Sequence, residues 1–260
     1  MGACAAFSPA TFLLARPRDV SHCSQSMVGS PPLRASNARV ARCSFTIIAA
    51  DCSAARSILV FKQDEDKIHN IGMNKLAACG GPNGDCTSFI EFVRCNLVLN
   101  GYRMGVPFST AAVANFTRGE LAKAVRKRPY QVSLLIGGVD APLTAPASKS
   151  AAADGAAAAE EKEAASGAAE EKHVPSLFFL DYMGTLQKVN FAAQGICGNF
   201  ILSLFDRHWK VGMTMAEAKE LVHACLEELK TRFMLSQPNF SIKVVNAAGT
   251  EVLDASWQVS

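Results

Sequence analysis

Two charged residues lie where two apolar runs of the sequence end, and their types and spacing could do chemistry. The run at 45–50 ends at Asp51, and the run at 58–61 leads into a charged patch that ends at Lys67. We expect the two runs to form adjacent buried strands, which would bring the Asp51 carboxylate and the Lys67 ammonium together at one strand end. Such a pair can support a hydroxyl nucleophile or act only as a structural ion pair.

Cysteine and histidine do not form a metal-binding pattern. The nine cysteines are Cys4, Cys23, Cys43, Cys52, Cys79, Cys86, Cys95, Cys197 and Cys225. Their count is odd and no Cys-x-x-Cys pair occurs, so neither a disulfide framework nor a zinc ribbon is predicted. His223 and Cys225 lie two positions apart on a predicted helix, which points them to different faces. We therefore expect reduced, mostly buried cysteines in a reducing compartment, with no metal and no cofactor.

Length and charge exclude several classes of protein. With 260 residues, of which 49% are hydrophobic, the chain can hold one large domain or two small ones. The formal net charge of +3 gives no reason to expect nucleic acid or an anionic membrane as a partner. The best candidate for a membrane span, at 191–204, is interrupted by glycine, glutamine and asparagine, so no span is predicted.

Three segments differ in composition from the rest of the chain. Residues 1–43 are rich in Ala, Ser and Arg, which is typical of an organellar transit peptide. A disordered extension, or a start mis-derived from the gene with Met27 as the real start, would have the same composition. Residues 141–175 form a low-complexity Ala/Glu insertion that lacks the large apolar side chains needed for a core. The predicted domain is 44–254, and 255–260 form a tail.

The remaining pattern groups strands and helices in pairs. Strands are predicted at 45–50, 58–61, 75–79, 131–138, 176–182, 240–245 and 251–253. Helices are predicted after Asp85, after Ser109, around 200–206 and after Thr214, where Glu217 completes a capping box. Single helices between strands would indicate a parallel sheet, whereas pairs do not. The order predicts an α+β fold, a four-layer αββα sandwich of two antiparallel sheets flanked by helix pairs.

Two motifs each have a functional and a structural interpretation. The glycine-rich segment 80–85 resembles a phosphate-binding loop, but no Gly-Lys-Ser/Thr follows it. We interpret it as a turn in which Asp85 caps the next helix. The basic run 123–128 (KAVRKR) could be a nuclear-import signal. The favoured interpretation is a solvated helix end, where cations are stabilised by the helix dipole.

Seven short stretches, in order along the chain, carry a family resemblance. They are 101–104 (GYRM), 114–118 (ANFTR), 121–122 (LA), 128–132 (RPYQV), 181–184 (DYMG), 225–229 (CLEEL) and 232–233 (RF). Together they resemble the beta subunits of the 20S proteasome core, from about residue 45 to residue 253, outside the insertion. The resemblance implies the N-terminal nucleophile hydrolase fold, which is a four-layer sandwich and agrees with the order of the elements.

The resemblance also implies where catalytic residues would lie. Active family members expose an N-terminal threonine by removing a propeptide, and an Asp and a Lys support it. Asp51 matches that Asp, and Lys67 matches the Lys sixteen positions later. The family spacing would place the threonine at Ala35, sixteen residues before Asp51, so the supporting charges are present and the nucleophile is not.

No other residue fits the missing nucleophile. Thr11 lies much too early, Thr46 lies inside a predicted strand, and Ser36 is one position off with no glycine before it. The glycine-rich first strand of the family is absent before residue 45, where 40–43 read VARC, which favours a mis-derived start. The loop 194–198 (QGICG) lacks the serine of active members. The resemblance therefore implies a non-catalytic member without catalytic residues.

The function expected from this resemblance is structural. We expect a non-catalytic beta subunit of the 20S core particle, in contact with other beta subunits of a heteroheptameric ring, with alpha-ring subunits and with the opposite beta ring. The particle would degrade ubiquitin-tagged proteins in the cytoplasm and nucleus, and Asp51 and Lys67 would form a structural charge pair. Two alternatives are an active Thr/Ser peptidase with Ser36 as its nucleophile after leader removal, and an organelle-targeted paralogue that works outside the proteasome.

Deleting residues 145–172 should leave folding and assembly intact, because the entropy of closing a surface loop changes only slowly with its length. Native gel electrophoresis would compare incorporation of the deletion variant into a multisubunit particle with that of the full chain. Loss of incorporation would show that the insertion makes a required contact.

Overall fold

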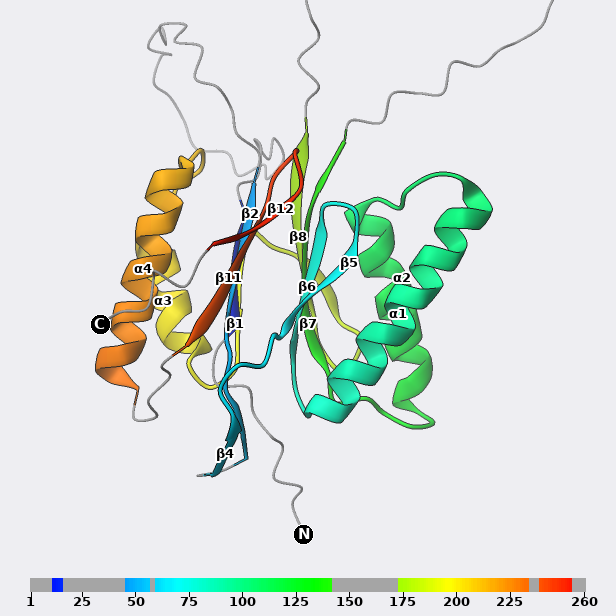
Figure 1. The fold of residues 1–260 in the computed structure, drawn as a ribbon, viewed down its shortest axis with the longest axis horizontal. Coiled ribbons are helices and arrows are strands. Elements are labelled where there is room, and N and C mark those ends of the chain that lie inside the picture. The colour runs from blue at the N-terminus through cyan, green and yellow to red at the C-terminus, as the bar shows by residue number, and fades with distance from the viewer. Residues whose placement is uncertain (1–10, 16–44, 57–58, 142–172, 234–238, 254–260) are drawn as a thin grey trace, which may run out of the picture.

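Two antiparallel sheets stacked face to face, with a helix pair outside each, make up the fold. The computed structural model describes residues 11–15, 45–56, 59–141, 173–233 and 239–253. Figure 1 shows the four layers, with α3 and α4 on one side and α1 and α2 on the other. This arrangement confirms the expected four-layer αββα sandwich. Within these segments, no helix has the length and apolar character needed to cross a membrane.

The first sheet has the strand order β10-β1-β2-β11-β12, and every neighbouring pair is antiparallel. Its strands are β1 (Thr11–Ala15), β2 (Thr46–Asp51), β10 (Phe191–Gln194), β11 (Phe240–Val245) and β12 (Thr250–Leu253). Helices α3 (Gly198–His208) and α4 (Met215–Arg232) cover its outer face. β2 lies at the centre, and all six of its residues are buried.

The second sheet has the strand order β5-β6-β7-β8-β9 and is also antiparallel throughout. Its strands are β5 (Ile68–Gly72), β6 (Lys75–Gly80), β7 (Ser133–Asp140), β8 (Val174–Leu180) and β9 (Leu186–Lys188). Helices α1 (Asn83–Met104) and α2 (Thr110–Val125) cover its outer face. A separate two-stranded ribbon pairs β3 (Ala54–Arg56) with β4 (Leu59–Lys62).

The alternation of side chains along β2 explains how one strand serves two cores. Ile47 and Ala49 pack under α3 and α4, whereas Ile48 and Ala50 belong to the core between the two sheets. Successive side chains of a strand point to opposite faces, so a strand with a packed layer on each side must be apolar at every position. The run at 45–50 therefore has the composition of a central strand.

The expected leader at 1–43 is wrong in one respect, because it contains the first strand of the fold. β1 (Thr11–Ala15) lies between β10 and β2, with Thr11 paired to both Gln194 and Ala50. The residues from 16 to 45 therefore connect two neighbouring strands, and the first strand that the sequence lacks immediately before residue 45 is supplied by Thr11–Ala15. Four apolar residues in a segment rich in Ala, Ser and Arg gave too short a pattern to predict a strand.

The second apolar run, at 58–61, does not form the buried strand of a main sheet that the sequence predicts. β4 pairs only with β3, and Val60 and Phe61 are 53% and 71% exposed. The adjacent main-sheet strand is β5, whose sequence IHNIG has only two large apolar residues. β9 and β10 were likewise not predicted, because each has only three or four residues.

Two helices, α2 and α4, begin at the predicted capping residues, whereas the predicted cap of α1 is wrong. The Ser109 side chain accepts a hydrogen bond from the Ala112 amide, and Thr214 and Glu217 form the expected capping box at α4. Asp85 does not cap α1, since Pro82 occupies the N-cap position and Asp85 lies in the first turn. The Asp85 carboxylate instead accepts from the backbone amide of Gln131, a contact that sequence spacing does not indicate.

The long connections at 16–45 and 141–173 leave the sandwich from the same end. Thr46 pairs with Val245, and the turn that follows Val245 receives a hydrogen bond from Asn74 to the Ala247 carbonyl. The Asn74 carbonyl in turn accepts from the Val139 amide, next to the point where Asp140 pairs with Val174. The ends of β7 and β8 are therefore paired up to the predicted insertion, of which residues 142–172 lie outside the described part of the chain.

The turn between β6 and α1 generates a testable prediction. Gly81 has φ +143°, and a Cβ on it would lie 2.2 Å from the Gln131 carbonyl oxygen, whereas Gly84 has nothing within 4 Å. Gly81→Ala should therefore lower the free energy of unfolding by about 2–4 kcal/mol, and Gly84→Ala should not lower it. Urea-induced unfolding of the full chain measures both, and equal stabilities of the two variants would contradict this account.

Candidate functional site

Asp51 and Lys67 form a buried ion pair at one end of the two sheets. The Lys67 Nζ lies 2.9 Å from the Asp51 Oδ2, and the two side chains are 13% and 0% exposed. Lys67 Nζ also donates to the Ser53 carbonyl at 2.7 Å, and the Ser53 amide donates to Asp51 Oδ2 at 3.3 Å. The expected charge pair at a strand end is confirmed.

Backbone hydrogen bonds on both sides hold the pair in place. Asp51 is the last residue of β2, and the Cys52 amide donates to the Asn239 carbonyl just before β11. Lys67 immediately precedes β5, and its carbonyl accepts from the Cys79 amide in β6 at 3.1 Å. Asp51 thus belongs to the first sheet and Lys67 enters the second, so the ion pair joins the two sheets.

A buried amide lies at the same end of the sandwich. Gln194 ends β10 opposite Thr11 and is buried, and among the described residues neither polar atom of its carboxamide has a hydrogen-bond partner. Its Oε1 lies beside Gly80, where an added Cβ would approach it to 3.2 Å. Sequence reasoning missed Gln194, because a glutamine at the end of a short strand carries no signal for burial.

The thiol of Cys52, which lies next to the Asp51–Lys67 pair, is a poor nucleophile. Cys52 follows Asp51 directly and is partly exposed. Burial raises the pKa of its thiol, and the neighbouring Asp51 and Asp66 carboxylates raise it further. Because the thiolate is the reactive form, Cys52 stays protonated and unreactive near neutral pH.

The residues considered as hydroxyl nucleophiles lie partly outside the described chain. Ala35 and Ser36, sixteen and fifteen positions before Asp51, are not among the described residues. Thr11 is the β1 residue paired with Ala50, much nearer to Asp51 in the sheet than its number suggests. Thr46 is buried at the other end of β2, as expected for a residue inside a strand.

The described residues contain no cluster of three His, Cys, Asp or Glu side chains that could hold a metal ion. His223 pairs with Glu227 on the outer side of α4, while Cys225 is fully buried, so the two point to different faces as expected. Burial raises the pKa of the Cys225 thiol to about 12, with a smaller contribution from Glu228.

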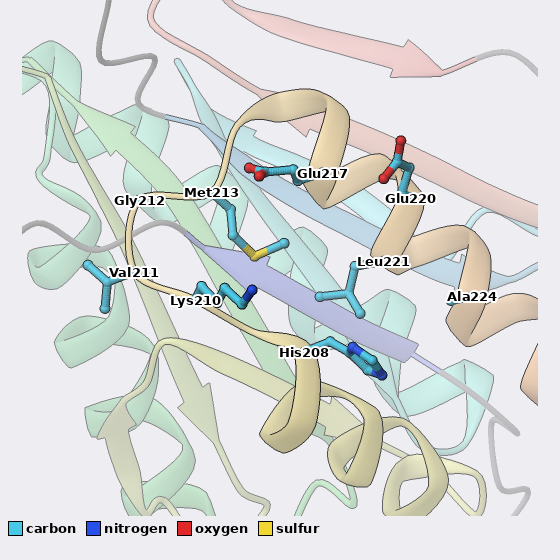
Figure 2. Close-up of a pocket in the computed structure, with 9 residues that line it drawn as sticks. All are labelled: His208, Lys210, Val211, Gly212, Met213, Glu217, Glu220, Leu221 and Ala224. Atoms are coloured by element: carbon cyan, nitrogen blue, oxygen red, sulfur yellow. The ribbon is translucent and has the colours of Figure 1, made fainter. Parts of the chain in front are cut away.

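A cavity of about 390 Å³ lies beside the loop between α3 and α4 (Figure 2). Met213 and Leu221 supply apolar lining, and the polar lining residues include His208, Lys210, Glu217 and Glu220. Glu217 is already hydrogen-bonded to Thr214 in the capping box. The cavity contains neither Asp51 nor Lys67, so it is separate from the ion pair.

Comparison with known proteins gives one consistent match. The family model described as "Proteasome subunit" matches residues 40–172 and 164–245. The chain is 41% identical to proteasome subunit beta type-2-B of Arabidopsis thaliana, over 83% of this chain and 92% of the relative. It is 38% identical to proteasome subunit beta type-2 of Oryza sativa subsp. japonica (79% and 82% covered) and 37% identical to that of Dictyostelium discoideum (78% and 89%).

Removing one charge of the buried pair should destabilise the protein strongly. Asp51→Asn or Lys67→Met should each cost about 3–5 kcal/mol, because either leaves a buried charge without its partner. The double variant should cost less than the sum of the two single changes. Lys62→Met is the matched control, since the Lys62–Asp64 pair is largely exposed and should contribute no more than about 1 kcal/mol. Additive losses in urea unfolding would rule out coupling.

Proposed function

This chain belongs to the proteasome subunit family, and from that membership we propose that it is a non-catalytic beta subunit of the 20S core particle. The observation that carries the proposal is the likeness to beta type-2 subunits, which extends over most of both chains. The four-layer sandwich agrees with it, because the same order of elements is expected of the family.

The geometry around Asp51 supports a structural role for this end of the fold. The Lys67 ammonium contacts the Asp51 carboxylate and the Ser53 carbonyl, so the pair ties the end of β2 to the start of β5. Cys52, the adjacent thiol, is kept protonated by burial and by the neighbouring carboxylates. The charges of the active members are therefore retained here as a fold-stabilising pair.

The proposed partners are other proteasome subunits. Proteasome beta subunits assemble in the core particle, and we place this chain in a heteroheptameric beta ring, against alpha-ring subunits on one side and the opposite beta ring on the other. It acts there in the degradation of ubiquitin-tagged proteins, in the cytoplasm and nucleus. The organelle-targeted alternative predicts that the chain never migrates with the particle, so co-purification separates the two.

A peptide epoxyketone probe should leave this chain unlabelled in the purified particle, because the probe needs an N-terminal hydroxyl nucleophile. The catalytic beta subunits of the same particle, which expose an N-terminal threonine, serve as the positive control. Mass spectrometry of the mature chain would identify its first residue in the same sample. A chain that begins at Ser36 and carries the probe would overturn the non-catalytic assignment.

A further inference from the structure

Two thiols are in contact where β6 leads into α1. Cys79 is the penultimate residue of β6, and Cys86 lies in the first turn of α1. Both are free and buried, and their side chains share a hydrogen bond. The function proposed above uses neither residue. Adjacent thiols can do chemistry that a lone buried cysteine cannot, because the second sulfur can trap an oxidised form of the first.

Backbone hydrogen bonds hold both cysteines in place. The Cys79 amide donates to the Lys67 carbonyl at 3.1 Å, and Cys79 is paired with Leu134 of β7. The Cys86 amide donates to the Pro82 carbonyl at 3.0 Å, at the start of α1. A disulfide forms without backbone movement only where the two cysteines are already close. The fixed backbone on both sides therefore keeps the two thiols adjacent.

The turn between the two cysteines is fixed as well. Gly81 lies against the Gln131 carbonyl with no space for a Cβ, and the Asp85 carboxylate accepts from the Gln131 amide. The segment 80–85 therefore cannot rearrange without losing its contacts with the residue before β7. Contact between the thiols is a property of the folded turn and does not depend on a bond between the two sulfurs.

The first turn of α1 is the route by which a small oxidant can reach the pair. Gly84 and Thr87, on either side of Cys86, are exposed, and nothing lies within 4 Å of a Cβ added at Gly84. Pro82 at the N-cap makes no side-chain hydrogen bond, whereas a side chain caps both α2 and α4. A helix end without a cap opens locally at a lower cost in free energy. Cys86 is therefore the thiol that meets the oxidant first.

Cys79 is suited to the second step of an oxidation. Burial raises the pKa of its thiol well above the ordinary value, and the hydrogen bond with Cys86 raises it further. Cys79 therefore stays protonated, and because the thiolate is the form that attacks a peroxide, it is not the first to react. Its contact with Cys86 allows it to attack the sulfenic acid that forms there.

We propose that Cys79 and Cys86 form a site of reversible covalent modification, at which a hydroperoxide converts the two thiols into a disulfide. The Cys86 sulfur takes one oxygen of hydrogen peroxide, the O–O bond breaks, and the other oxygen leaves as water. The Cys79 sulfur then bonds to the Cys86 sulfur, the S–O bond breaks, and the Cys79 proton leaves with that oxygen as a second water.

The reaction balances as two thiols and one peroxide giving one disulfide and two waters, and a dithiol reductant restores both thiols. The product ties the first turn of α1 to β6 next to Lys67, whose carbonyl holds the Cys79 amide. Because both cysteines belong to one chain, the site does not depend on the proposed function, and the two can fail separately.

The tryptic peptide 76–94 tests the reaction directly, because Cys79 and Cys86 are its only cysteines. The folded full chain is treated with hydrogen peroxide, catalase removes the peroxide, and free thiols are alkylated after denaturation. The peptide should resist alkylation and be lighter than its reduced form by two hydrogens, and dithiothreitol should restore two alkylated cysteines. A peptide that keeps two free thiols, or that gains oxygen without forming a disulfide, overturns the proposal.

Cys225 controls for folding in the same sample. Its thiol is buried and its pKa is raised to about 12, so it should be recovered as a free thiol after peroxide treatment of the folded chain. A disulfide in 76–94 that forms only when Cys225 is also oxidised belongs to the unfolded chain and overturns the proposal.

Thermal unfolding provides a second readout with matched variants. Peroxide should raise the Tm of the full chain by about 5 °C or more, because the disulfide restricts the unfolded chain. Cys95→Ser should show the same rise, since Cys95 is an exposed thiol on the same helix, whereas Cys86→Ser should show none. Dithiothreitol should reverse the rise. A rise in Cys86→Ser equal to that in the full chain overturns the pairing of the two thiols.

Discussion

The buried contact between Asp51 and Lys67 is the constraint on which one end of this fold depends. A charge transferred from water into a protein interior is costly unless an opposite charge and further hydrogen bonds replace the solvent. Here the Ser53 backbone supplies those additional bonds, and strand pairing fixes both residues in their own sheets. Because the carboxylate belongs to one sheet and the ammonium to the other, the pair also sets how the two sheets meet.

Helices and strands that are specified by a pattern within one short segment could be predicted from the sequence. β2 was predicted because a strand buried on both faces is apolar at every position, and α4 because its capping box and apolar face lie within one segment. β1 and β5 could not be predicted, since β1 is a short apolar run in a segment rich in Ala, Ser and Arg, and β5 has only two large apolar residues. At β4 the apolar run predicts a buried strand, but Val60 and Phe61 are exposed in a two-stranded ribbon.

In the candidate site, likewise, positions that depend on distant segments of the chain could not be predicted. The Asp51–Lys67 pair was predicted correctly, although Lys67 immediately precedes β5 and does not follow a buried strand at 58–61. The place of a nucleophile, counted back from Asp51, falls at 35–36, outside the described residues, whereas the strand that pairs with this side of β2 is Thr11–Ala15. Gln194 could be identified only from the structure, where its buried side chain lies beside Gly80 of the other sheet.

The two long connections of this chain leave the sandwich at one pole, and the ion pair lies at the other. Changes in length at the first pole add sequence between strand ends that are already paired, so they do not alter strand register or the ion pair. The opposite pole has no such freedom, because a shift of one residue there would separate a buried carboxylate from its counter-charge. Within a single domain, one pole can therefore change in length without cost to the core, while at the other the strand ends must keep their register.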